Sequence, residues 1–285
     1  MDPVERRYRE HLSERDLALI AGALPGDREP VEASGRFQAV LEALARDEAF
    51  DRVFGRNRDE VIAVSPFLAF TAIVHRAERE LQAMTHVQEW VGPRRRLPVF
   101  GAPELRDFLA EPASKLFLAE LLTSYVHISS GSVVVRSARG WRRHRFSELD
   151  PVRLASLLEV VQEVERPGLY RRLGDLALFL TGVFPDRSAT RSFREIDSTR
   201  LLMAAGIERA EASRQEEPLN FLEGLGRRWY QLAYTTAVRN RTFELETVGA
   251  IARHFSSARR ALNFVTDRYL FPLRGRWFGT TPGGP

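Results

Sequence analysis

Residues 170–185 read YRRLGDLALFLTGVFP, and this stretch decides the fold. After Gly174 it is almost wholly apolar, with the single charge of Asp175 near its start. A helix that is apolar all round lies inside a protein rather than on its surface. The apolar part is also shorter than the about 20 residues that span a bilayer. We therefore expect residues 170–184 to form the central helix of a mainly α-helical, multi-helix bundle.

Apolar residues recur at spacings of three and four on both sides of this segment, which is typical of amphipathic helices. Pro66 either lies inside a helix over residues 60–84 or marks that helix's first turn, where proline is tolerated. Two later helices, over residues 218–237 and 246–270, are expected to pair as an antiparallel helical hairpin. The helical periodicity is clearest in five ranges, 60–84, 113–126, 190–212, 218–237 and 246–270.

One segment departs from the helical pattern. Residues 132–136 are short and β-branched, residues 137–140 resemble a turn, and residues 141–146 return with alternating character, which predicts one small β-hairpin over residues 132–146. The proline-bracketed sequence GPRRRLP at residues 92–98 is expected to be a loop.

These elements suggest one helical core domain over residues 56–278 that carries the hairpin. Residues 1–55 form an N-terminal helical segment, and the sequence leaves open whether it is a separate subdomain. Residues 279–285 are rich in glycine and proline and are expected to be a loose tail.

The composition excludes several classes of site. The 285 residues contain no cysteine, so disulfides, thiol nucleophiles and thiolate metal sites are ruled out within this chain. The first 25 residues mix both charge signs and lack the apolar core of a signal peptide. No segment has the length and hydropathy of a membrane span. We expect a cytoplasmic protein that does not bind a membrane.

Positive charge is concentrated in the predicted hairpin. Residues 131–200 hold 13 arginines against nine acidic residues, whereas residues 1–60 hold ten arginines against 14 acidic residues. Residues 132–146 contain no acidic residue, and residues 94–96 form a second arginine cluster. An acidic protein or nucleic-acid phosphate is the partner that such a field favours. The predicted partner-binding arginines are Arg136, Arg139, Arg142, Arg143, Arg145, Arg94, Arg95 and Arg96.

The alternative is an arginine-rich hairpin that only faces solvent. A winged-helix protein would also carry a basic hairpin after two helices, but the helix over residues 113–127 is too apolar to read bases in a groove. The sequence therefore disfavours specific DNA recognition and leaves phosphate, RNA or an acidic surface open.

Asp175 marks a second candidate, a pocket on the central helix. A lone buried carboxylate is costly, so it is expected to be paired or protonated. Arg171 and Arg172 lie four and three residues earlier, close enough for an ion pair that fixes the helix register. The other interpretation is a carboxylate with a raised pKa that serves a ligand.

A third candidate is a metal or haem site. His75 and Glu78 lie on one stripe of a predicted helix, and Glu120 and His127 lie on a stripe of another. If the stripes faced each other, the four side chains would suit Zn²⁺, Mn²⁺ or iron. Because the first stripe lies opposite the apolar face, a solvated surface is the alternative. For haem ligation the candidates are His75, His127 and His254.

The segments YRRLGDLALFLTGVFPD (residues 170–186) and SPFLAF (residues 65–70) resemble a family of bacterial hypothetical proteins of unknown function. The resemblance implies no activity. Neither a P-loop nor a dinucleotide-binding, nucleophile-elbow or zinc-protease motif is present. The sequence therefore favours a non-enzymatic interaction or regulatory module that binds an anionic partner through the basic hairpin. The alternative is a metal- or haem-binding helical-bundle enzyme.

Overall fold

The computed structural model describes residues 2–21, 41, 46, 50, 64–92, 95–127, 130–137, 140–190, 193–208, 217–237 and 242–271. For residues 21, 90–92, 95, 130–137, 140–146 and 189–190 the description covers the backbone alone. The predicted tail over residues 279–285 lies outside the described residues. Contacts divide the chain into two compact units, and the expected boundary at residue 55 is not a boundary of either. Unit 1 comprises residues 1–88, 98–127 and 264–285, and unit 2 comprises residues 89–97 and 128–263.

Unit 1 is built around helix α6, which begins at Pro66. Ser65 caps this helix by accepting a hydrogen bond from the backbone N–H of Leu68 at 3.1 Å, so the proline marks the first turn. Every side chain from Phe67 to His75 is buried, and α6 packs against α7 and α8. The described helices of unit 1 are α1 (Pro3–His11), α2 (Glu14–Ala21), α6 (Pro66–Leu81), α7 (Ala102–Ala110), α8 (Pro112–Ser124) and the π-helical turn η3 (Thr266–Leu270).

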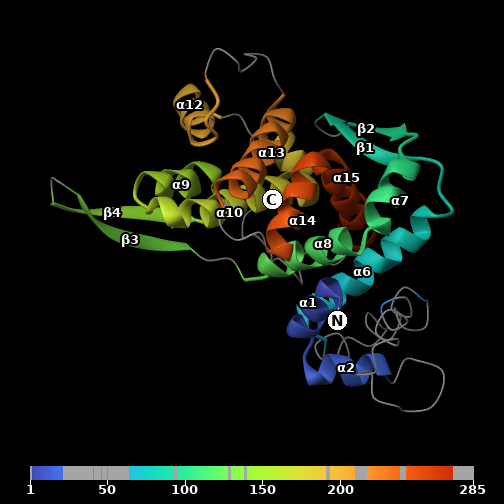
Figure 1. Ribbon diagram of the computed structural model, residues 1–285. Helices are drawn as coiled ribbons and strands as arrows, with labels where there is room; N and C mark the ends of the chain where they lie inside the picture. Colours follow the sequence, from blue (N-terminus) through green and yellow to red (C-terminus); the bar gives the residue numbers. More distant parts are fainter. Residues whose placement is uncertain are drawn as a thin grey trace, which may run out of the picture. The chain divides into compact units, whose positions relative to one another are not determined.

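Unit 2 confirms the central helix. Helix α10 (Arg166–Val183) buries almost every side chain from Leu173 to Val183 and packs most extensively against α13 (Pro218–Thr236), which lies beside it in Figure 1. The other helical elements that belong to this unit are α9 (Pro151–Ala155), η1 (Ser156–Glu159), η2 (Glu163–Glu165), α11 (Pro185–Thr190), α12 (Glu195–Ala204), α14 (Phe243–Arg253) and the part of α15 (Phe255–Val265) up to residue 263.

Small residues let α10 and α13 approach closely. A Cβ atom at Gly174 would lie 2.4 Å from the Tyr230 ring, and one at Gly226 would lie 2.7 Å from the Cβ of Ala177. Real Cβ atoms do not approach that closely, so both glycines are required by the helix crossing.

The mainly α-helical bundle is confirmed, but two details of the prediction are wrong. The helix expected over residues 246–270 is interrupted at His254, whose backbone leaves helical geometry at φ −109° and ψ 29°. The loop expected over residues 92–98 is largely a second two-stranded sheet of β1 (Val87–Gly92) and β2 (Arg95–Val99). Pro98 does not prevent this, because a strand at a sheet edge tolerates proline. The structure therefore has a second two-stranded sheet besides the predicted hairpin.

The predicted hairpin over residues 132–146 is confirmed, with strands β3 (Ser130–Ser137) and β4 (Gly140–Ser147) in antiparallel pairing. Among the described helices, none is both long enough and apolar enough to cross a membrane.

Candidate functional site: an arginine-rich hairpin

The backbone register of the β3–β4 hairpin sorts its arginines by face. Arg136 pairs with Trp141, Val134 pairs with Arg143, and Ser132 pairs with Arg145. Directly paired residues share one face of an antiparallel sheet, and residues two apart along a strand share it too. Arg136, Arg143 and Arg145 therefore occupy positions on one face together with Trp141. We call this set of four residues the basic face.

The opposite face of the hairpin has a different composition. Val135 pairs with Arg142, Val133 with His144, and Gly131 with Phe146. Arg142 is therefore separated from the other three arginines, and valine and phenylalanine dominate its face. Arg139, at the turn, lies outside the described residues. The two faces therefore differ in their share of arginine, with three arginine positions on one face and one on the other.

The C-terminal end of the hairpin is fastened to the helices of unit 2. Strand β4 contacts α9 and η1, and Figure 1 shows the hairpin as an arm that extends from this point. Just after β4, Asp150 caps α9 by accepting hydrogen bonds from the N–H groups of Val152 and Arg153 at 3.0 and 3.3 Å. Glu148 forms an ion pair with Arg172 of α10 at 3.4 Å. These contacts give the arm a fixed base.

The second arginine cluster does not extend the same sheet. Arg95 and Arg96 lie in β2, which pairs with β1 in a sheet separate from β3–β4. The side chain of Arg96 is exposed, and Arg94 lies outside the described residues. The predicted partner-binding residues thus fall on two different sheets.

Asp175 is half-buried and has a partner that the sequence did not indicate. The hydroxyl of Tyr230 on α13 donates a hydrogen bond to its Oδ1 atom at 2.8 Å. Arg172, one of the two arginines predicted to pair with Asp175, forms an ion pair with Glu148, which lies outside α10. The sequence predicts an ion pair between Asp175 and an arginine one turn earlier on α10, whereas this hydrogen bond joins α10 to α13 at their crossing.

Of the residues proposed for a metal, His75 and Glu78 lie on α6 and Glu120 lies on α8, and these two helices pack together, whereas His127 follows the end of α8. Lys115 donates to Glu78 at 2.6 Å, and Glu120 accepts from Arg7 at 2.7 Å. The side chain of His127 is exposed. Within the described part of the chain, no group of three or more histidine or carboxylate side chains is arranged to hold a metal.

The burial of His75 shows that the alternative of a solvated stripe is wrong for this part of α6. Thr71 and His75 are both buried, and the ring of His75 lies within hydrogen-bond reach of the Tyr8 hydroxyl at 3.3 Å. Burial, and then the charge of Lys115, lower the pKa of His75 to about 3. The imidazole is therefore neutral at pH 7. His254, another residue considered for haem, is exposed.

Around His75, charged groups from three helices gather. Burial raises the pKa of Glu120, but hydrogen bonds from His11 and Arg7 outweigh this, and the pKa lies below its ordinary value. Burial and the nearby Glu120 and Glu78 raise the pKa of Tyr8. The one signal of this network in the sequence is the only lysine, Lys115, placed beside an apolar run.

Comparisons of the chain with protein-family models, with curated proteins and with solved structures found no match.

Proposed function

We propose that this protein is a non-enzymatic module that binds single-stranded nucleic acid, preferably RNA, through the basic face of the β3–β4 hairpin. The observation that carries the proposal is the register, which gathers Arg136, Arg143 and Arg145 with Trp141 on one side of the arm. The cytoplasmic location and the membership in a bacterial family are part of the same proposal.

Charge supports an anionic partner. Residues 130–147 contain five arginines and no acidic residue, so nothing within the hairpin neutralises them. Arg143 and Arg145 are two residues apart on one strand, which separates their Cα atoms by about 7 Å. Guanidinium groups bind phosphate in a bidentate manner, and a row of them suits a polyanion better than an isolated charge.

Trp141 supports nucleic acid over an acidic protein. Proteins that bind single strands combine a basic surface with aromatic residues on which bases stack. A tryptophan within a set of arginines fits that pattern. Binding to an acidic protein surface would require the positive charges but not an aromatic ring for stacking. A two-stranded ribbon can also enter the major groove of DNA, so duplex DNA is the natural comparison ligand.

The test is fluorescence anisotropy with a labelled 20-nucleotide oligouridylate and a duplex DNA of equal length. The variant in which Arg136, Arg143 and Arg145 all become glutamine should weaken RNA binding at least tenfold, because each charged contact contributes to affinity. Trp141→Ala should also weaken RNA binding, although it leaves the charge of the protein unchanged, because base stacking is lost.

The control variant changes three exposed arginines of unit 2 to glutamine, Arg194, Arg227 and Arg253, and so removes the same net charge. Equal loss of affinity in both triple variants would show that only overall charge matters and would overturn the proposal. Displacement of the RNA by polyglutamate at equal charge concentration would instead identify an acidic protein as the partner.

A further inference from the structure

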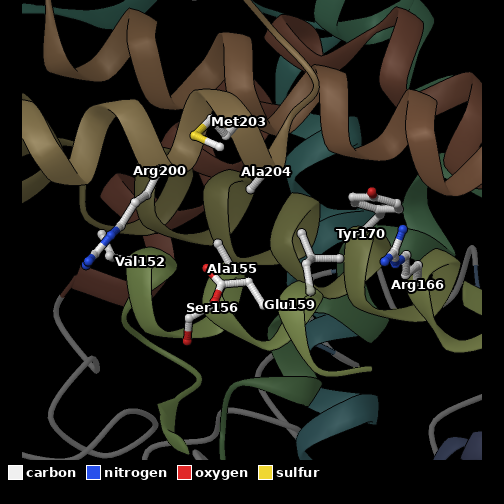
Figure 2. A pocket seen from close by; sticks show the side chains of 10 residues that line it. Val152, Ala155, Ser156, Glu159, Arg166, Tyr170, Arg200, Met203 and Ala204 are labelled. Carbon is white, nitrogen blue, oxygen red and sulfur yellow. The ribbon is translucent and has the colours of Figure 1, made fainter. Parts of the chain in front are cut away.

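Unit 2 contains a pocket of about 410 Å³ that the hairpin does not use. It lies among α9, η1, the first turns of α10 and α12, and Figure 2 shows side chains from these elements around it. Its volume falls within the range of small-molecule sites, which are lined by apolar groups with a few polar ones. Its charged lining residues are Glu159, Arg166 and Arg200.

Arg166 carries a buried donor with nothing to bind. Its Nε atom is shielded from solvent and has no hydrogen-bond partner. Buried N–H groups are nearly always satisfied, and leaving one unmade is unfavourable. Among the residues that the structure describes, neither Arg166 nor Arg200 nor Glu159 takes part in an ion pair. Two guanidinium groups without an ion pair therefore line the pocket, on opposite sides of it in Figure 2, and Arg166 is the one that lies beside a further donor, Tyr170.

Apart from Ser156 and Tyr170, the rest of the lining is apolar. Val152 and Leu158 are half-buried, while Met203 is 74% exposed although it borders the pocket. An exposed methionine at a pocket mouth offers flexible apolar contact to a ligand. The ligand that fits this lining has an apolar body and a charged end.

The three ionisable groups of the lining indicate the sign and size of the charge that a ligand should carry. Two arginines against one glutamate leave a lining with one net positive charge. Glu159 is exposed and would repel a multiply charged anion more than a singly charged one. The hydroxyl-bearing Tyr170 also lines the pocket and lies near Arg166 in Figure 2, as a further donor to an oxygen.

We propose that this pocket binds a small, singly charged carboxylate with an aliphatic body. The carboxylate oxygens accept hydrogen bonds from Arg166 and the neighbouring Tyr170, and the aliphatic chain rests on Leu158 and Met203. Arg200, on the other side of the pocket, adds positive charge to the lining without contacting the carboxylate. The site is separate from the basic face and does not depend on the function proposed for the hairpin.

Octanoate is the probe, and calorimetric titration into the full-length protein is the measurement. Acetate carries the charge without the chain, and 1-octanol carries the chain without the charge. We expect saturable octanoate binding that is at least tenfold tighter than that of either comparator, since the site recognises both parts. Absence of saturable octanoate binding, or equal affinity for acetate, would overturn the proposal.

Substitutions test the residues. Arg166→Gln should weaken octanoate binding at least tenfold and Arg200→Gln severalfold, whereas Glu159→Gln should tighten it because a like charge is removed. Arg253→Gln, an exposed arginine on α14 away from the pocket, is the matched control and should leave affinity unchanged.

If Arg166 had a purely structural role, its substitution would lower the thermal unfolding temperature. Because its Nε has no hydrogen-bond partner among the described residues, we expect instead that Arg166→Gln leaves the thermal unfolding temperature unchanged or raises it. Unaltered octanoate affinity in both arginine variants would show that the guanidinium groups do not contribute to octanoate binding.

Discussion

Single residues of unit 1 carry the clearest pH dependence. His75 is held neutral, with a pKa of about 3, by burial and by Lys115. In the unfolded chain the same imidazole titrates near its ordinary value of 6.5. Between these two values the unfolded state binds the additional proton. The free energy of unfolding therefore falls as pH decreases below 6.5 and is constant with respect to this group above it.

The free energy of unfolding should fall by about 2 kcal/mol between pH 7 and pH 5. Carboxylates titrate mostly below this pH range and contribute little to the change. Urea unfolding at several pH values measures it. His75→Gln should flatten this dependence, while His127→Gln, at an exposed position, should retain it. An unchanged pH profile in His75→Gln would contradict the assignment. At lower pH the depressed pKa of Glu120 adds its own loss of stability as that carboxylate is protonated.

Arg259 makes the second residue-scale prediction. It is buried and donates hydrogen bonds to Glu223 at 2.7 Å, to Glu89 at 2.9 Å and to Asn263 at 3.1 Å. Without Arg259, the largely buried carboxylates of Glu223 and Glu89 lose a positive charge that offsets their own. Arg259→Leu should therefore lower the free energy of unfolding by about 3 kcal/mol. Chemical denaturation is the measurement.

Arg227 is the matched comparison, because it binds the same Glu223 from an exposed position, at 3.2 Å with 45% of its side chain exposed. Arg227→Leu should cost less than about 1 kcal/mol, as exposed ion pairs do. Similar losses in both variants would show that burial does not decide the strength of these pairs.

At the scale of elements, the contact between α10 and α13 depends on glycine. Gly226→Ala would force its new Cβ against Ala177 and the Phe255 ring, where no flexible chain end can yield, and should destabilise the protein by about 1–3 kcal/mol. Gly224→Ala, two residues earlier on the same helix, meets nothing within 4 Å and should stabilise by about 0.5–1 kcal/mol. Thermal unfolding of both variants measures the difference, and losses of equal size would contradict the close packing.

The elements were predictable where local physics determines them. Uniform hydrophobicity identified α10, and β-branched residues followed by alternation identified β3 and β4. The β1–β2 sheet was missed because the three arginines and two prolines of residues 92–98 favoured a loop, and because Val87, Trp90 and Val91 do not alternate with polar residues at the period of a strand. Periodicity continues through His254, so the interruption between α14 and α15 left no mark in the pattern.

At the scale of the whole molecule, long-range pairing was beyond the sequence. Asp175 and Tyr230 are 55 positions apart, and Arg259 and Glu89 are 170 apart, so no spacing rule connects them. The division into two units was equally hidden, because each unit draws on separate stretches of the chain. Residue types identified the arginines of the candidate site, but only the strand register separated Arg142 from the basic face.

The salt dependence of RNA binding tests the central claim most directly. The logarithm of the binding constant falls with the logarithm of salt concentration by about 0.7 for each phosphate contacted on a single strand. Loss of Arg136, Arg143 and Arg145 should therefore reduce the magnitude of this slope by about 2 relative to the unaltered protein. An identical slope in the triple variant would show that the basic face does not contact phosphates.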